Sequence, residues 1–259
     1  MVFRDDALTG KVVLVTGGGT GMGIDMAVGC AEVGADVVVL SRNLDHLQPV
    51  ADRIRELGRR SMPVVCDVRD PEAVSRAVDQ VVEAFGRLDV LVNSAAGNFR
   101  CPALDLSPNG WRTVVDIDLN GTFFCSQAAA RHMVERGGGA IVNIIGDFVE
   151  THGERMSHAA AAKSGIWNLT RSLAVEWGNQ GIRVNSIAPG PIVTEGGVQA
   201  LGRSEAFEEI VRSVPLGSTG HERDVTNALI YLASDAAAFV TGATLMVDGG
   251  HSFGGYDLP

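Results

Sequence analysis

The sequence predicts an α/β fold: a single-domain, doubly wound parallel sheet of about seven strands with helices on both faces. Short apolar runs rich in Val, Ile and Leu alternate with helical patterns through most of the 259 residues. These runs are continuously apolar, as in parallel strands that are covered on both faces. No linker, repeat or low-complexity segment interrupts the alternation, so we expect residues 1–259 to form one domain.

The elements follow from local patterns. The expected strands are Val12–Thr16, Asp36–Ser41, Met62–Cys66, Val90–Asn93, Ala140–Ile145, Arg183–Ile187 and Thr244–Val247. Before the fourth strand, Asp70 is placed to cap a helix, Pro71 suits its first turn and Gly86 is placed to end it. A helix is also expected over Ser157–Trp177, whose apolar residues could face the core or a subunit interface. A mobile substrate loop is expected around residues 194–215, where glycine is frequent.

The first strand runs directly into a glycine-rich turn, and a helical pattern then extends to about Val33. Strand, glycine turn and helix in this order are typical of a site for the pyrophosphate of a dinucleotide. Glycines let backbone N–H groups approach phosphates, and the helix N-terminus favours an anion. The turn therefore predicts a Rossmann-type domain. Its expected cofactor contacts are Gly17, Gly19, Thr20, Gly21, Met22 and Gly23.

The end of the second strand indicates which nicotinamide cofactor is bound. An acid at this position accepts hydrogen bonds from a free ribose 2′-OH, whereas an arginine suits a 2′-phosphate. Here Ser41 and Arg42 stand at the tip, and Asp45 comes too late to take the place of the acid. A charged hydrogen bond contributes about 1.5–3 kcal/mol, enough for ten- to hundredfold discrimination. We therefore expect NADP(H), the alternative being that Arg42 is a solvated residue at the start of a helix.

Composition and charge narrow the class of partner. The net charge of −10 disfavours nucleic-acid binding. The four cysteines form no CxxC pair, so we expect buried, reduced thiols and no metal site. No apolar run reaches the roughly 18 residues of a membrane span, and Met1 opens no signal-peptide pattern. We expect a cytoplasmic protein without a membrane partner.

Five motifs resemble, in order and spacing, those of the short-chain dehydrogenase/reductase family, and the match runs from about Gly10 to Gly250. They are Thr16-Gly-Gly-Gly-Thr-Gly-Met-Gly23, Cys66-Asp-Val68, Asn93-Ser-Ala-Ala-Gly97, Lys163 and Pro189-Gly-Pro-Ile192. The resemblance implies that Lys163 holds the nicotinamide ribose. It further implies cofactor contacts from Asp67, Val68, Asn93, Ala95, Gly97, Pro189, Gly190 and Ile192.

Three departures from the family pattern bear on the chemistry. The family tyrosine, four residues before the lysine, falls on Ala159, and the family serine falls on Gly146. The family asparagine falls on Asp118, so only Lys163 is kept. An ordinary ketone reductase is disfavoured because its proton donor is missing.

One branch of the family, the 2,4-dienoyl-CoA reductases of the peroxisomal type, is similar in the same places. The stretches that carry this resemblance are Asn93–Pro102, Asp116–Asp118, His158–Lys163 and Ala188–Gly196. Membership implies NADPH-dependent reduction of a 2,4-dienoyl-CoA to a 3-enoyl-CoA, catalysis by Asp118 and Lys163, and a homotetramer. The tyrosine that stabilises the thioester oxygen in the mitochondrial type has Phe148 as its equivalent here.

Such a conjugate reduction fits the residues present. Hydride adds at the far end of the double bonds, and a proton can reach carbon through a water that Asp118 orients, so a tyrosine is not obligatory. The charge of Lys163 could stabilise the dienolate. Asp118 could instead be an ordinary helix carboxylate. Candidate substrate residues, each with a structural alternative, are Phe99, Asp147, Phe148 and His158.

Two other functions remain open. The protein could act on another substrate, such as a 2-enoyl-CoA or a hydroxy compound. It could also be a non-catalytic NADP(H)-binding protein, which the missing tyrosine and serine favour and the retained Lys163 disfavours.

Overall fold

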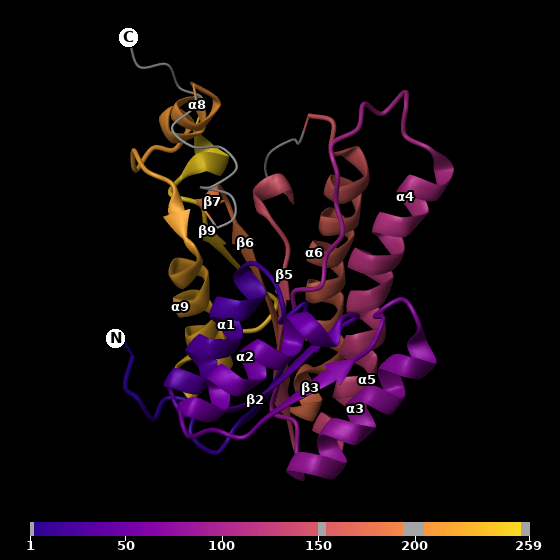
Figure 1. The fold of residues 1–259 in the computed structure, drawn as a ribbon, viewed down its shortest axis with the longest axis vertical. Coiled ribbons are helices and arrows are strands. Elements are labelled where there is room, and N and C mark those ends of the chain that lie inside the picture. The colour runs from indigo at the N-terminus through magenta and orange to yellow at the C-terminus, as the bar shows by residue number, and fades with distance from the viewer. Residues whose placement is uncertain (1–2, 150–153, 194–204, 255–259) are drawn as a thin grey trace.

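The computed structural model describes residues 3–149, 154–193 and 205–254. One parallel sheet has the strand order β3-β2-β1-β4-β5-β6-β9, with helices on both of its faces (Figure 1). Its strands are β1 (Val12–Thr16), β2 (Asp36–Ser41), β3 (Ser61–Val65), β4 (Val90–Asn93), β5 (Gly139–Ile144), β6 (Ile182–Pro189) and β9 (Thr244–Val247). The predicted fold class is therefore confirmed.

The strand predictions differ from the structure only at their ends. β3 and β5 each begin and end one residue earlier than expected. β6 continues to Pro189, because Ala188 and Pro189 still pair with Met246 and Val247 of β9. A separate two-stranded sheet joins β7 (Ile192–Val193) to β8 (Gly220–His221).

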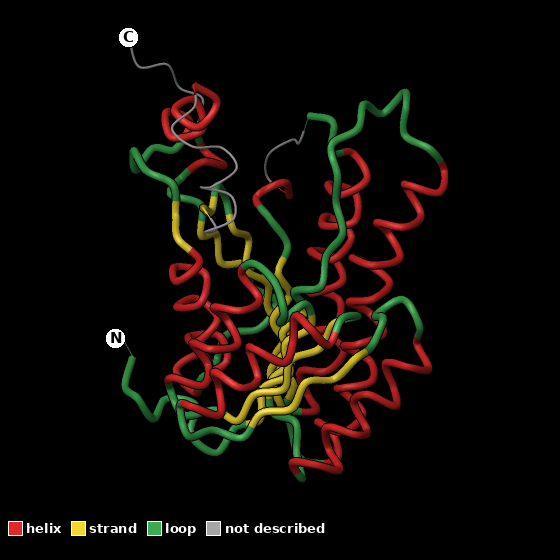
Figure 2. The backbone as a smooth tube through the Cα atoms, viewed as in Figure 1, coloured by secondary structure: helices red, strands yellow, loops and turns green. Residues whose placement is uncertain are grey.

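Alternate residues of β1, β2, β4 and β5 supply two different cores. Val13 and Val15 of β1 belong to one buried cluster, and Val12 and Leu14 to the other. This explains why the strand is apolar at every position. Helices α1 (Met22–Glu32), α2 (Leu44–Glu56) and α9 (Glu222–Ala233) cover the first face. Helices α3 (Pro71–Phe85), α5 (Gly121–Glu135) and α6 (Ser157–Trp177) cover the second face, as Figure 2 shows.

The predicted ends of α3 are confirmed. The Asp70 carboxylate accepts hydrogen bonds from the backbone N–H groups of Glu72 and Ala73, both at 3.0 Å. Gly86 ends the helix in the left-handed region, at a φ of 77°. In α6, Ile166 and Leu173 are buried in the core of this chain.

The expected substrate loop is described only in part. Residues 194–204 lie outside the described residues, whereas helix α8 (Glu205–Ser213) occupies most of the rest. Cys30, Cys66 and Cys125 are buried free thiols as predicted, but Cys101 is only half-buried because it lies in the loop after β4. No helix among the described residues is long and apolar enough to cross a bilayer.

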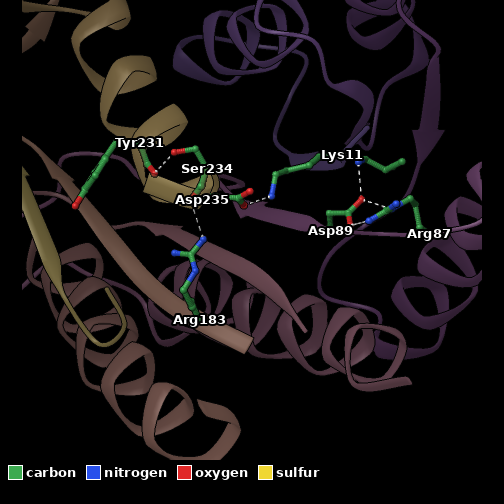
Figure 3. Close-up of polar contacts among 8 residues, drawn as sticks. Lys11, Arg87, Asp89, Arg183, Tyr231, Ser234 and Asp235 are labelled. Atoms are coloured by element: carbon green, nitrogen blue, oxygen red, sulfur yellow. Dashed lines mark hydrogen bonds and ion pairs between the residues drawn. The ribbon is translucent and has the colours of Figure 1, made fainter. Parts of the chain in front are cut away.

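Polar contacts link the segments at the amino-terminal ends of the strands (Figure 3). The Asp89 carboxylate accepts from the backbone N–H of Val12 at 2.8 Å, and Lys11 pairs with Asp235 at 2.8 Å. Arg183, at the start of β6, donates to the carbonyl of Ser234. These bonds fix the beginnings of the strands, and the loops at their carboxyl ends are left to form the site.

A buried polar network joins the central strands to the second helical face. The side-chain amide of Asn93 donates to Ser126 and to Asn143, both at 2.9 Å. The Asn143 amide donates in turn to the Thr170 hydroxyl of α6 at 2.8 Å. The network fixes α5 and α6 against the ends of β4 and β5.

Candidate active site

The glycine turn after β1 packs so closely that side chains cannot be added at its two ends. A Cβ on Gly17 would lie 2.9 Å from the Cα of Ala95, and the φ of Gly17 is +69°. A Cβ on Gly23 would lie 2.2 Å from the carbonyl oxygen of Gly17. The first turn of α1 therefore lies directly against the turn, as a pyrophosphate site requires. Gly19 packs on His46, and Gly21 has a φ of +51°.

Thr16 fixes the turn to the loop that follows β4. Its hydroxyl accepts hydrogen bonds from the backbone N–H groups of Ser94 and Ala95, both at 3.1 Å. The same hydroxyl donates to the carbonyl of Val92 at 3.3 Å. The two loops on either side of the β1–β4 boundary are thus held at a constant separation.

A cavity of about 700 Å³ opens where these loops meet the ends of β2 and β3. This boundary is the point at which the strand order reverses, where doubly wound sheets bind their ligands. The cavity is lined by Gly17, Thr20, Met22, Gly23, Leu40, Ser41, Arg42, Asn43, His46, Cys66, Asp67, Val68, Ser94, Ala95 and Ala96. The glycine cradle and the cavity fit the adenosine and pyrophosphate of a dinucleotide.

Arg42 is exposed at the tip of β2 and lines this cavity, where a ribose 2′-substituent would lie. Asp67 also lines the cavity, and the guanidinium of Arg69 donates hydrogen bonds to both of its carboxylate oxygens. Hydrogen bonds from Arg69, with a smaller contribution from the charge of Arg42, lower the pKa of the Asp67 carboxyl. No described residue accepts a hydrogen bond from the Arg42 guanidinium, so its donors can bind a ligand.

The two predicted catalytic side chains meet as a buried ion pair. The Nζ atom of Lys163 lies 3.3 Å from Oδ2 of Asp118, and the two side chains are 8% and 0% exposed. Oδ1 of Asp118 accepts the backbone N–H of Gly97 at 2.8 Å, and Nζ donates to the carbonyl of Ile144 at 3.0 Å. The pair therefore connects the helical turn at Asp116–Asn120, α6, the end of β5 and the loop after β4.

A π-helical turn presents Asp118. Residues Asp116–Asn120 form one such turn between α4 (Pro108–Val115) and α5, where the N–H of Gly121 bonds the carbonyl of Asp116 five residues back. Single π turns inside longer helices occur frequently at functional sites. The sequence placed Asp118 on a helix but gave no sign of this turn, because its bonding depends on tertiary packing.

Lys163 and Asp118 each keep hydrogen-bonding capacity. An ammonium has three donors, and the carbonyl of Ile144 accepts one of them, so donors remain for a ribose hydroxyl. Oδ2 of Asp118 accepts no well-aligned hydrogen bond from the described residues. It can therefore accept one from a water.

Asp147 is paired rather than free. Its Oδ2 lies 2.5 Å from Nδ1 of His251, in the turn that follows β9. Burial raises the pKa of the Asp147 carboxyl, and the hydrogen bond to His251 opposes part of this shift. His251 was not among the predicted residues, although the predicted strand at Thr244–Val247 already placed it beyond a carboxyl end.

His158 and Phe99, both predicted as substrate residues, lie together. The centres of their rings are 4.6 Å apart, with the ring planes inclined by 35°. His158 is fully buried, and neither of its ring nitrogens has a hydrogen-bond partner in the part of the chain that the structure describes. The structure does not describe the side chain of Phe148.

Other predicted residues lie around the same edge. Asn93 is the last residue of β4, and its side-chain amide belongs to the buried network. It therefore fixes the start of the loop that follows β4. Gly190 follows the end of β6, and a Cβ there would lie 2.5 Å from Cβ of Asp248. Pro189 ends β6 and Ile192 begins β7, both away from the cavity that Arg42 lines.

Known proteins place this chain in a family. A family model described as Enoyl-(Acyl carrier protein) reductase matches residues 17–252. The chain belongs to the short-chain dehydrogenase/reductase family and is an oxidoreductase. The fold of this family binds a nicotinamide cofactor.

Two relatives and one solved structure show which members of the family this chain is similar to. A protein of Bacillus subtilis named probable 2,4-dienoyl-CoA reductase, (2E)-enoyl-CoA-producing, is 46% identical over 93% of this chain and 96% of its own length. A peroxisomal 2,4-dienoyl-CoA reductase, (3E)-enoyl-CoA-producing, of Danio rerio is 41% identical over 96% and 84%. A gluconate 5-dehydrogenase of Burkholderia cenocepacia in complex with NADP and tartrate superposes with a TM-score of 0.91. It is 35% identical, covering 97% of this chain and 99% of that one.

The ion pair yields a prediction about stability. Lys163→Met leaves the carboxylate of Asp118 buried without a counter-charge, so the free energy of unfolding should fall by about 3–5 kcal/mol. Adding Asp118→Asn removes the stranded charge and should restore a large part of that loss. Urea unfolding of both single variants and the double variant, at one protein concentration, gives the coupling between the two sites. Additive effects would contradict the pair.

Proposed function

We propose that this protein catalyses the NADPH-dependent reduction of a 2,4-dienoyl-CoA to a 3-enoyl-CoA. The observation that carries the proposal is the buried Asp118–Lys163 pair, next to positions 146 and 159 that carry Gly and Ala. Positions 146 and 159 supply no hydroxyl to protonate a ketone oxygen, but Asp118 supplies a carboxylate that can hold a water. The names of the dienoyl-CoA reductase relatives support the same substrate class.

Lys163 and Asp118 have different roles in the proposed reduction. NADPH, when bound, supplies the hydride that adds to C5 of the dienoyl thioester. The Lys163 ammonium has donors left to bind the nicotinamide ribose, and its charge lowers the energy of the dienolate that forms on the substrate. Asp118 is fixed by Gly97 and Lys163, so it holds a water at Oδ2 from which a proton reaches C2.

The specificity for NADP(H) rests on Arg42. Its exposed guanidinium lines the cavity at the tip of β2, and no carboxylate stands at that tip to receive a 2′-OH. The NADP-bound gluconate 5-dehydrogenase, at 35% identity, supports the same choice.

Arg42→Ala tests this specificity. The variant should lose about 1.5–3 kcal/mol of NADPH binding, a ten- to hundredfold rise in Kd, with the Kd for NADH unchanged. Fluorescence titration with each nucleotide measures both constants. Arg53→Ala, an exposed arginine further along α2, is the matched control. An equal loss for both nucleotides would contradict recognition of the 2′-phosphate.

Activity is tested with purified protein, NADPH and 2,4-hexadienoyl-CoA, by following the nicotinamide absorbance. Turnover is expected, with one dienoyl thioester consumed per NADPH oxidised. In D₂O, NMR of the product should show deuterium at C2 and a double bond between C3 and C4. A 2-enoyl product labelled at C4 would instead match the type named for the Bacillus subtilis relative. No turnover at saturating concentrations overturns the proposal.

Asp118→Asn tests the water-holding role. The amide oxygen can still accept the N–H of Gly97, so the loop keeps its anchor while the carboxylate is lost. We expect kcat to fall by about 10²–10⁴-fold, because proton delivery in the transition state is worth that much. The Kd for NADPH should not change. Asp105→Asn, an exposed residue of the neighbouring loop, is the control and should match wild type.

Oxidation of a hydroxy compound is the second candidate, because the gluconate 5-dehydrogenase resembles this chain over 97% of its length. A panel of hydroxy acids with NADP⁺ separates it from dienoyl-CoA reduction. Binding of NADPH without turnover of any substrate would indicate a non-catalytic NADP(H)-binding protein.

We further propose a cytoplasmic homotetramer of single-domain subunits. Exposed apolar side chains on α4, α5 and α6, namely Trp111, Val134 and Val175, support an assembly through that helical layer.

A further inference from the structure

One buried histidine has no role in the mechanism above. His158 is 0% exposed, and both of its ring nitrogens are without hydrogen-bond partners among the described residues. Buried polar groups are nearly always paired, and an unsatisfied one costs about 1–3 kcal/mol. A group retained at such a cost within a candidate active site points to a partner that arrives with the ligand.

The position of His158 relates it to the ion pair. It lies in the first turn of α6, five residues before Lys163, which is roughly 7–8 Å along the helix axis. Gly165, two turns further along nearly the same face of α6, packs on Leu119, the neighbour of Asp118. His158 therefore lies on the side of α6 that faces Leu119, in the same turn as Asp118, and about one and a half turns before Lys163.

Phe99 covers the imidazole. It stands two residues after Gly97, whose N–H is held by Asp118, so the ion pair anchors the loop that carries this ring. The N–H of Cys101 also bonds the carbonyl of Arg155, which ties the loop to the segment before α6. Phe99 is 43% exposed, so its outer side has room to move when an acyl group enters.

We propose that His158 is a further catalytic residue, whose imidazole N–H donates a hydrogen bond to the thioester oxygen of the acyl-CoA. This inference rests on the proposed function. As hydride adds to C5, the electron pairs of the conjugated system shift and negative charge gathers on that oxygen. A neutral imidazole has one N–H donor and keeps its proton throughout. When the proton from the Asp118-held water reaches C2, the carbonyl re-forms.

The chemistry of the site requires such a donor. An oxyanion is stabilised by a fixed donor in a water-excluded site, and removing one costs about 10²–10³-fold in kcat. Gly146 and Ala159 have no side-chain donor, and the charge of Lys163 is already shared with Asp118 and Ile144. His158 supplies a buried N–H with no competing acceptor within the described part of the chain.

The test compares His158→Leu, of similar shape and apolar, with His158→Gln, which keeps an N–H donor. The probe is 2,4-hexadienoyl-CoA bound with NADP⁺, whose dienoyl absorbance moves to longer wavelength when the thioester oxygen accepts a hydrogen bond. The shift is expected in wild type, weaker in His158→Gln and absent in His158→Leu. The kcat of His158→Leu should fall about 10²–10³-fold with the Kd for NADPH unchanged.

Stability separates this role from a structural one. Replacing an unsatisfied buried polar group by an apolar group of similar shape is neutral or stabilising, so the Tm of His158→Leu should equal or exceed that of wild type. A lower Tm would show that the imidazole has a structural partner, and would overturn the inference. So would a normal kcat and an unchanged absorbance shift in an otherwise active His158→Leu. Absence of turnover by wild type overturns the proposed function, and this inference with it.

Discussion

The buried pair of Asp118 and Lys163 is the interaction on which the active site depends. Its two charges lie 3.3 Å apart and come from different helices. The carboxylate also holds the backbone of Gly97, and the ammonium holds the carbonyl of Ile144. Because either charge alone would be uncompensated in the interior, the pair fixes four chain segments in one arrangement. The loop that covers His158 and the end of β5 therefore cannot move independently of it.

Stability does not explain why an ion pair stands here. Well-packed apolar side chains of similar volume usually hold two helices as well as a buried ion pair does, or better. The pair lies at the carboxyl edge of the sheet, where doubly wound folds place their ligands, and each member keeps capacity for a further hydrogen bond. A π turn, which gives up regular helical geometry, presents one of its members. These features together indicate a site kept for chemistry.

Much of this architecture could be predicted from the sequence, and the remainder could not for a definable reason. The strands, the glycine turn and the caps of α3 are set by local pattern, and all appear within a residue or two of the expected places. The approach of Asp147 to His251 joins residues that are 104 positions apart, and no local pattern encodes it. The missing hydrogen bonds of His158 likewise depend on how Phe99 packs over it. The sequence could thus identify Asp147, His158 and Phe99, but neither His251 nor the contacts among these residues.

The departures from the family pattern act together. Replacing the tyrosine and serine by Ala159 and Gly146 removes the groups that give a proton to a carbonyl oxygen. Replacing the asparagine by Asp118 adds a carboxylate that pairs with Lys163 and can hold a water. In a conjugate reduction, negative charge spreads over the conjugated thioester. Such a reaction needs a fixed hydrogen-bond donor at the thioester oxygen and a source of a proton for the carbon. In the proposed reaction His158 is the donor at the oxygen and Asp118 holds the water, so the residues of this site form a consistent set for conjugate reduction.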